Sequence, residues 1–413
     1  MPESTVDVLL IGGGVASAAA AGELRRRGFE GTVTLATREL DAPYHRPPIT
    51  KALLRAPADE NELVVHPAGW WKENDVELLT RSAVMSLDPE NRIAKLANKT
   101  ELHYGKALLA TGAMIRRLPI DGAALKGIHY LRTPANATAV REEAAEADRI
   151  ILVGGSFIAV EVAAQLASLG HRCTIVMQEG QCLERTFGDT VAGYVTGLLT
   201  RNGVEIMCGV DVAAFVGDER VTGVRTVDGQ HVDGDLVVVG AGAVPDTKLA
   251  ARAGLQLGAT GGVKCDKYLR TSFPDIYAAG DVCEYDSVVH GRPLRVEHEE
   301  HAAAQGVTAA RNILGDEVPH TEVPYFWTDI SDWTKLEYVG PAPRWDREVV
   351  SGSVNDGDFT VWYVAEDRLV AALTAGRPQD LDTARKQITA EEPVSADFFE
   401  PRAQEAPSTA APW

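Results

Sequence analysis

Two short apolar runs, each ending in a glycine-rich turn, constrain this chain more than any other feature. The first spans residues 8–17 and reads VLLIGGGVAS, and the second spans residues 150–159 and reads IILVGGSFIA. Between a strand and a helix, such a turn brings backbone N–H groups to a pyrophosphate at the positive end of the helix dipole. The two turns therefore predict an α/β protein with two Rossmann-like dinucleotide-binding domains, one for a flavin and one for a nicotinamide cofactor.

The first turn has the residues that a dinucleotide site needs. Gly12 permits the tight turn, Gly14 permits close approach of the pyrophosphate, and Ser17 replaces the third glycine with a small residue. The next strand lies in the segment 32–39, TVTLATRE, which ends in Glu39, and we expect Glu39 to accept hydrogen bonds from ribose hydroxyls. Neighbouring positions predicted to contact the same cofactor are Val15 and Ala16.

The second turn keeps Gly154 but has small residues in place of two of the three glycines. Its strand after the helix, at residues 173–177, ends without an acid, and Glu179 follows two residues later. We expect Glu179 to bind the adenosine ribose, and no arginine stands beside it before Arg185 to pair with a 2′-phosphate. NADH is therefore favoured over NADPH, and a nucleotide fold without a ligand is the alternative. Further predicted contacts are Gly155, Phe157 and Ile158.

Charge and composition exclude several classes of partner. The net charge of −19 and the pI near 5.0 disfavour general binding to nucleic acid or to anionic membranes, because the long-range field repels both. The chain begins without a signal peptide and has no apolar run of membrane length, so we expect a soluble, cytoplasmic protein. Its five cysteines lack C-x-x-C spacing, which indicates neither a metal site nor a disulfide framework.

A local basic patch could still bind an acidic partner. Arginines that could build such a patch are Arg25, Arg26, Arg27, Arg116, Arg117, Arg292 and Arg295. The ordinary alternative is that these arginines are separate, solvated surface residues.

The order of the signals predicts a nested architecture. A predicted strand at residues 275–282 delivers an acid at a helix start, so the chain returns to the first domain after the second one is complete. Alternating strands at 349–353, 359–364 and 369–374, followed by a helix at 381–388, predict a small C-terminal domain. The predicted boundaries are 1–115 and 246–325 for the two parts of the FAD-binding domain, 116–245 for the NAD-binding domain, 326–390 for the C-terminal α+β domain and 391–413 for a disordered tail.

Residues 43–51, PYHRPPITK, are the most specific motif. They resemble the P-Y-x-R-P-P-L-S-K motif of the FAD-dependent NADH:ferredoxin reductase family, of the putidaredoxin reductase and aromatic dioxygenase reductase type. Other matching segments are ATGA at 110–113, YAAGD at 277–281, FWTD at 326–329 and Arg377-Pro378. The resemblance covers residues 6–388 and implies a glutathione-reductase-like fold plan, with FAD and NADH as cofactors.

The resemblance also assigns roles to individual residues. It places Arg46 at the FAD pyrophosphate, Asp281 at the ribityl hydroxyls, and Trp327 against the isoalloxazine. Lys51 and Glu161 resemble the pair beside the hydride-accepting nitrogen, where a lysine would favour the anionic reduced flavin. Lys51, Glu161 and Trp327 are the predicted catalytic residues. Residues 295–302 are similar to the apoptosis-inducing factor branch, which places Glu297 and His298 near the nicotinamide. The other predicted cofactor contacts are Ala110, Thr111, Gly112, Arg132, Gly242 and Gly280.

The missing cysteine pair points to the acceptor. Glutathione-reductase-like enzymes carry a C-x₄-C pair facing the flavin, whereas residues 44–51 contain no cysteine. Electrons must then leave directly from the flavin edge, and an iron–sulfur ferredoxin is the natural acceptor. We therefore predict an FAD-dependent NADH:ferredoxin reductase of an oxygenase system, as a monomer or homodimer. The alternatives are an NADH oxidase that produces peroxide and an NADH-sensing signalling flavoprotein similar to apoptosis-inducing factor.

Overall fold

The first glycine turn lies at the end of a central strand in a seven-stranded sheet, in a computed structural model that describes residues 3–57 and 63–399. The sheet has the order β3-β2-β1-β6-β5-β4, and β18 also pairs with β6. Strands β1, β2, β3, β6 and β18 run parallel, whereas β4 and β5 form an antiparallel hairpin beside β6. The strands are β1 (Glu3–Ile11), β2 (Val33–Ala36), β3 (Val76–Leu79), β4 (Val84–Asp88), β5 (Ile93–Leu96), β6 (Glu101–Leu109) and β18 (Ile276–Ala278).

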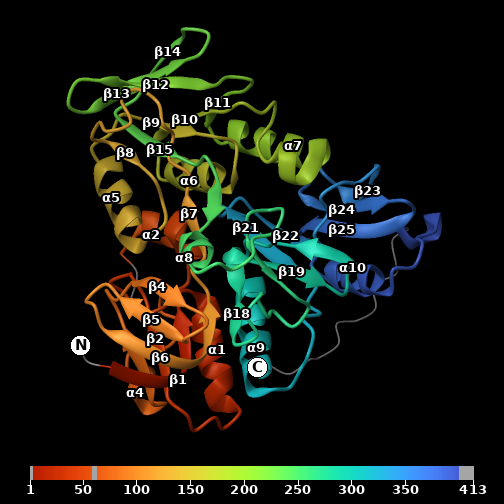
Figure 1. The fold of residues 1–413 in the computed structure, drawn as a ribbon. Helices are drawn as coiled ribbons and strands as arrows, with labels where there is room; N and C mark the ends of the chain where they lie inside the picture. Colours follow the sequence, from red (N-terminus) through yellow and green to blue (C-terminus); the bar gives the residue numbers. More distant parts are fainter. Residues whose placement is uncertain (1–2, 58–62, 400–413) are drawn as a thin grey trace.

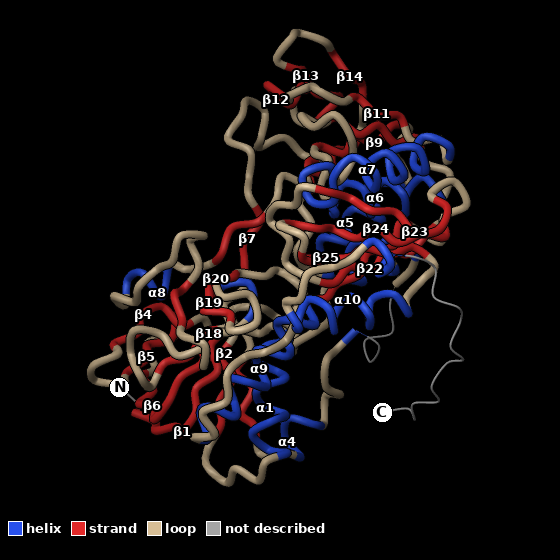
Figure 2. Tube along the Cα trace, turned by 90° about the vertical axis from the view of Figure 1, so that its right-hand side faces the viewer, coloured by secondary structure: helices blue, strands red, loops and turns tan. Residues whose placement is uncertain are grey.

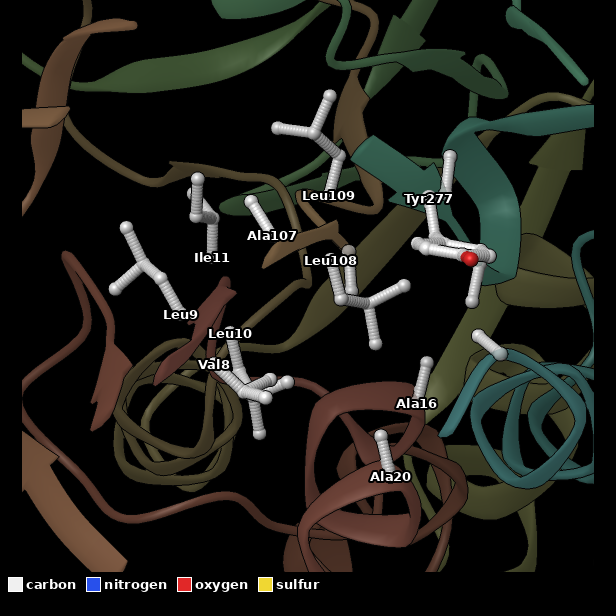
Figure 3. Packing of buried hydrophobic residues seen from close by; sticks show 14 of the residues in the cluster. Val8, Leu9, Leu10, Ile11, Ala16, Ala20, Ala107, Leu108, Leu109 and Tyr277 are labelled. Carbon is white, nitrogen blue, oxygen red and sulfur yellow. The ribbon is translucent and has the colours of Figure 1, made fainter. Parts of the chain in front are cut away.

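Two helices from distant parts of the chain pack together on this sheet. Helix α1 (Val15–Arg26) follows the glycine turn, and α9 (Glu299–Leu314) comes almost 300 residues later (Figure 1). A Cβ at Gly306 of α9 would lie 2.1 Å from the carbonyl oxygen of Ala16, so the close packing requires glycine there. Beneath them, Leu10, Leu108 and Tyr277 fill the core (Figure 3). The chain therefore returns to its first sheet, as the nested architecture predicts, while the individual domain boundaries stay predictions.

The second glycine turn belongs to a separate parallel sheet of order β11-β10-β9-β15-β8. Its strands are β8 (Ile128–His129), β9 (Arg149–Val153), β10 (Arg172–Val176), β11 (Glu205–Met207) and β15 (Leu236–Val239). The helices of this part are α5 (Pro134–Ala144), α6 (Phe157–Ser168) and α7 (Glu184–Arg201), and an antiparallel sheet is formed by β12 (Val212–Gly217), β13 (Val221–Thr226) and β14 (His231–Asp233). The chain passes from the first part to the second and later back again. The two connecting segments, β7 (Ala113–Ile115) and β16 (Ala243–Pro245), form an antiparallel pair.

An antiparallel sheet of order β21-β22-β25-β24-β23 follows, and it includes the three strands predicted for this region (Figure 2). One face packs with α6 and α7, and the other face is covered by α10. The elements are β21 (Tyr325–Ile330), β22 (Thr334–Val339), β23 (Arg347–Ser353), β24 (Asp358–Ala365), β25 (Arg368–Ala375) and α10 (Gln379–Ala390). The sheet thus lies against the second unit and brings β21 to the space between the two nucleotide-binding parts.

Short elements complete the connections between these parts. They are η1 (Pro47–Thr50), α2 (Ala52–Arg55), α4 (Trp70–Glu73), α8 (Lys248–Arg252), β17 (Val263–Cys265), η2 (Gly280–Val282), β19 (Cys283–Ser287) and β20 (Arg292–Leu294). In the described part of the chain, no helix has the length and apolarity that crossing a membrane requires.

The prediction of a disordered tail from residue 391 is wrong for residues 391–399. This segment contains η3 (Ala396–Phe399), and the Phe399 ring lies 6.2 Å from the Trp362 ring of β24. The Ser351 hydroxyl of β23 donates a hydrogen bond to the Phe399 carbonyl oxygen at 3.1 Å. Aromatic burial on the C-terminal sheet offsets the polar composition that suggested disorder. Residues 400–413 lie outside the described residues.

Candidate cofactor site

A cavity of about 640 Å³ opens between the two nucleotide-binding parts and the C-terminal sheet. This volume is within the range of small-molecule and cofactor sites, about 300–1,000 Å³. The walls come from the β1–α1 turn, the end of β2, η1, the end of β6, η2, the start of α6, the start of α9 and β21.

Most of the residues predicted to bind cofactor line this cavity together. They are Gly12, Gly14, Val15, Ala16, Glu39, Arg46, Lys51, Ala110, Thr111, Gly112, Arg132, Phe157, Ile158, Glu161, Gly280, Asp281, Glu297, His298 and Trp327. Ser17 does not line it, because its side chain is fully buried within the packing of α1. The other four predicted residues, Gly154, Gly155, Glu179 and Gly242, lie at the second glycine turn or on the chain crossing beside it.

The first glycine turn has the geometry of a phosphate cradle. Gly12 has a φ of 123°, and a Cβ there would lie 2.1 Å from the carbonyl oxygen of Ala110. Gly14, in contrast, has no atom within 4 Å of the position that a Cβ would take, so the turn is open on the cavity side. Gly14 is the N-cap of α1 and supplies no side-chain hydrogen bond. The first N–H groups of α1 are thus available to an anionic ligand, and the donor set fits a pyrophosphate.

A charged cluster lies beside this turn. The Arg46 guanidinium donates to Glu39 with an Nη2–Oε1 distance of 2.8 Å, and the Tyr44 hydroxyl donates to Glu39 at 2.6 Å. Burial acts to raise the pKa of Glu39, but Arg46 and Tyr44 together lower it below its usual value. Burial raises the pKa of Asp281, and the Arg132 guanidinium, 3.6 Å away, opposes that shift. Sequence reasoning missed Tyr44 as a cavity residue, although it stands in the motif at 43–51.

Lys51 and Glu161 form an ion pair at the junction of the parts. The distance from Lys51 Nζ to Glu161 Oε1 is 2.8 Å, and the two side chains are 11% and 8% exposed. Lys51 follows η1 and Glu161 lies in α6, so more than 100 residues of chain separate them. Lys51 Nζ also lies 5.1 Å from the centre of the Trp327 ring of β21, a cation–π distance. The three residues predicted to be catalytic therefore meet at one place, while their roles stay predictions.

Trp327 has two further contacts that the sequence did not indicate. Its indole Nε1 donates to Glu300 of α9 at 2.8 Å, and Lys335 Nζ of β22 lies 5.7 Å from the ring centre. Next to it, the His298 ring stacks on Phe326 at 4.0 Å, and burial lowers the pKa of His298 to about 4. His298 is therefore neutral near pH 7 and contributes hydrogen-bonding capacity rather than charge to the cavity wall.

The second turn has its own close packing. Gly154 has a φ of 109°, and a Cβ there would lie 2.5 Å from the carbonyl oxygen of Gly240. A Cβ at Gly155 would lie 3.3 Å from Glu179 Oε2, so this carboxylate is adjacent to the turn. The expectation that Glu179 has no arginine beside it is wrong, because Arg185 Nε lies 2.9 Å from Glu179 Oε1. Helix α7 begins one residue before Arg185, and its first turn brings Arg185 next to Glu179. The spacing of the predicted strands does not indicate this contact.

Several arginines of the expected basic patch have carboxylate partners. Ion pairs join Arg26 to Glu23, Arg27 to Asp316, and Arg295 to Glu297. Two other arginines of the set donate to backbone carbonyls, Arg25 to Phe29, Gly31, Asn74 and Asp75, and Arg292 to Pro341. Arg116 and Arg117 are exposed. Carboxylates thus neutralise three of the seven arginines, and the backbone carbonyls that bind Arg25 and Arg292 leave the charge of those two unchanged.

Comparison with known proteins agrees with this arrangement. The family model described as pyridine nucleotide-disulphide oxidoreductase matches residues 6–306, and the model described as reductase C-terminal matches residues 325–405. The 5,5′-dehydrodivanillate O-demethylase ferredoxin reductase subunit of Sphingobium is 35% identical over 92% of this chain and 93% of its own length. Putidaredoxin reductase of Pseudomonas putida is 31% identical over 95% of this chain and 94% of its own length.

Solved structures with the same fold extend over almost the whole chain. A ferredoxin reductase from Rhodopseudomonas palustris has a TM-score of 0.91 at 32% identity, covering 95% of this chain and 96% of that one. The covalent putidaredoxin reductase–putidaredoxin complex contains a chain with a TM-score of 0.90 at 30% identity, covering 96% of both chains.

Proposed function

The chain belongs to the pyridine nucleotide-disulphide oxidoreductase family, and we propose that it transfers electrons from NADH through FAD to a ferredoxin of an oxygenase system. The observation that carries this proposal is the meeting of Lys51, Glu161 and Trp327 in a cavity beside an open phosphate cradle. No cysteine is among the residues that line the cavity in the described part of the chain, so no protein thiol there can take electrons onward.

Different cavity residues would bind different parts of FAD. The open β1–α1 turn and Arg46 would bind the pyrophosphate, Glu39 the adenosine ribose, and Asp281 the ribityl chain. FAD, when bound, accepts a hydride and can release its two electrons one at a time. Lys51 would place a positive charge beside the flavin ring, which favours the negative charge that the ring gains on reduction. While the flavin is oxidised, Glu161 would balance the charge of Lys51.

NADH would bind across the second turn and reach the cavity past Phe157 and Ile158 at the start of α6. Glu179, which lies beside Gly155 and is paired with Arg185, would accept hydrogen bonds from the ribose hydroxyls. Neutral His298 and Glu297 line the same cavity and would orient the nicotinamide amide. These groups act by orientation, and none of them needs to exchange a proton with substrate.

The acceptor is tested by following electrons out of the reduced protein. Protein reduced with NADH under anaerobic conditions is mixed in a stopped-flow instrument with a [2Fe–2S] ferredoxin, or separately with dioxygen. We expect reduction of the ferredoxin to be much faster than formation of peroxide. Equal NADH consumption in air with and without ferredoxin, with stoichiometric peroxide, would instead identify an oxidase. A long-lived charge-transfer band with changed sedimentation and no acceptor activity would favour the signalling alternative.

A further inference from the structure

Glu161 has two hydroxyl donors in addition to Lys51. Glu161 Oε1 accepts a hydrogen bond from Thr328 Oγ1 at 2.6 Å, on the same oxygen that faces Lys51 Nζ at 2.8 Å. Glu161 Oε2 accepts a hydrogen bond from Thr50 Oγ1. Counted over whole residues, Glu161, Thr328 and Thr50 are 6%, 1% and 8% exposed, so water has little access to this carboxylate. The two threonines thus replace much of the solvation that Glu161 loses on folding.

The two threonines reach Glu161 from different parts of the chain. Thr50 ends η1, directly before Lys51, so one short segment supplies both a hydroxyl and the ammonium group. Thr328 lies in β21, where buried and partly exposed residues alternate, and its side chain is on the buried side. The C-terminal sheet is therefore in direct hydrogen-bonding contact with the ion pair beside the cavity.

A buried ion pair is favourable only when the remaining lone pairs of its carboxylate are satisfied. Without Thr328 and Thr50, Glu161 would have a single donor in a region from which water is nearly excluded. We propose that Thr50 and Thr328 are positioning residues that hold the Glu161 carboxylate in place and fix its Oε1 against Lys51. The C-terminal sheet, through Thr328, then helps to position the charged pair beside the flavin, an inference that rests on the proposed function.

Other charged groups near the pair must be considered in any test that varies pH. Asp329, next to Thr328 in β21, interacts electrostatically with Lys51, Lys335 and Glu161. Burial raises the pKa of Asp329, while Lys51 and Lys335 oppose that shift. Asp329→Asn is therefore combined with each threonine variant, so that titration of Asp329 is not taken for an effect at Glu161.

The test measures the reduction potential of bound FAD by spectroelectrochemistry at pH 6 and pH 8. Thr328→Val and Thr50→Val remove one donor each and keep the side-chain shape. We expect both variants to raise the potential at both pH values, in the same direction as Glu161→Gln, because a carboxylate that loses a donor is held less firmly against Lys51 and compensates its charge less. Thr328→Ser should restore the wild-type potential. Thr374→Val is the matched control, since Thr374 is equally buried but its hydroxyl bonds only to Thr360, Phe359 and Arg377 of the C-terminal part.

The outcomes separate this inference from the proposed function. Valine variants that keep the wild-type potential at both pH values, while Glu161→Gln shifts it, would overturn the positioning role and leave the electron-transfer function intact. An unchanged potential in Glu161→Gln as well would remove the pair from the proposed function. If Thr328→Val does not fold, Thr328→Cys supplies a weak S–H donor, for which an intermediate shift is expected and a wild-type potential would contradict the inference.

Discussion

At Lys51, a single ammonium group lies between a buried carboxylate and the face of an indole ring. Of these two charges, only that of the Lys51 ammonium group favours negative charge on the flavin, and Lys51→Met removes it. We expect the variant to accept a hydride from NADH more slowly, on the order of 10²-fold, and to have a lower FAD reduction potential. Stopped-flow reduction and a potential titration measure the two effects. Lys335→Met, whose Nζ lies near the same ring but 5.7 Å from its centre, is the control and should change both less.

His45 gives a pH-dependent contribution to stability. Its Nδ1 lies 2.6 Å from Glu299 Oε1 at the start of α9, and this hydrogen bond raises the pKa of His45 above its ordinary value of 6.5. A raised pKa in the folded state adds stability that is complete below the unfolded pKa and is lost as pH rises through the folded pKa. Because the His45 side chain is 40% exposed, solvent screening limits the effect to about 0.5 kcal/mol.

His45→Gln should therefore destabilise the protein at pH 6 and have almost no effect at pH 9. Thermal unfolding at fixed FAD concentration across this range measures the difference between wild type and variant. His171→Gln changes a histidine between α6 and β10 and is the control, because it leaves the contact between His45 and Glu299 in place. A His45 difference that stays constant with pH would mean that protonation of His45 does not contribute.

At the scale of elements, the start of α7 brings Arg185 to Glu179 beside the second glycine turn. We expect NADH to reduce the flavin at least about tenfold faster than NADPH, a difference of roughly 1.4 kcal/mol, because Glu179 binds ribose hydroxyls and repels a 2′-phosphate. Glu179→Ser should reduce this preference by releasing Arg185 to meet the phosphate. Adding Arg185→Ala should remove the gain with NADPH. Equal rates with both cofactors in the wild type would exclude Glu179 from this role.

The segment 391–399 is a second element whose packing can be tested. Phe399 contacts Trp362, and Arg347 of β23 lies 5.9 Å from its ring. Phe399→Ala removes this half-buried ring and should lower the free energy of unfolding by about 1–2 kcal/mol. Asp397→Ala, at an exposed position of the same short helix, is the matched control. Equal melting temperatures for Phe399→Ala and wild type would show that the segment contributes nothing to stability.

At the scale of the whole molecule, the net charge of −19 governs long-range encounters with an acidic ferredoxin. Because Arg26, Arg27 and Arg295 have carboxylate partners, we expect repulsion to dominate, so that the rate constant for electron transfer rises as salt screens it. Stopped-flow transfer is measured at low and high ionic strength, with an uncharged small oxidant as control. A rate that falls with salt would instead point to local attraction, and Arg116→Gln/Arg117→Gln should then abolish the fall.

The family relation also acts at this scale. The chain is an FAD-dependent oxidoreductase that uses NAD(P)H, with two nucleotide-binding parts and a C-terminal domain. Each part contributes one side of the Lys51, Glu161 and Trp327 meeting point, so no single part contains the complete site.

Much of this arrangement could be predicted from the sequence because its signals are local. The strand–glycine–helix pattern around Gly12 is continuous in the sequence, and so is the series of strand segments at 349–374. The close approach of Gly12 to Ala110 and the burial of both faces of β24 are not local. The resemblance of the motif at 43–51 to a known family also predicted that Arg46 and Lys51 contact the cofactor, and both residues line the cavity. The predictions of the fold class, the cofactors and the oxidoreductase activity are confirmed for these reasons.

Only the tertiary structure decided which distant groups form a hydrogen bond, an ion pair or a packing contact. The partners of Glu161 come from η1 and β21, Arg185 returns to Glu179 through a helix, and residues 391–399 pack on a sheet formed earlier in the chain. Such contacts depend on how whole elements cross, and a sequence pattern with a period of a few residues does not encode that. The sequence by itself therefore determined the two nucleotide folds and their chemistry, while the tertiary structure decided how their charges are balanced.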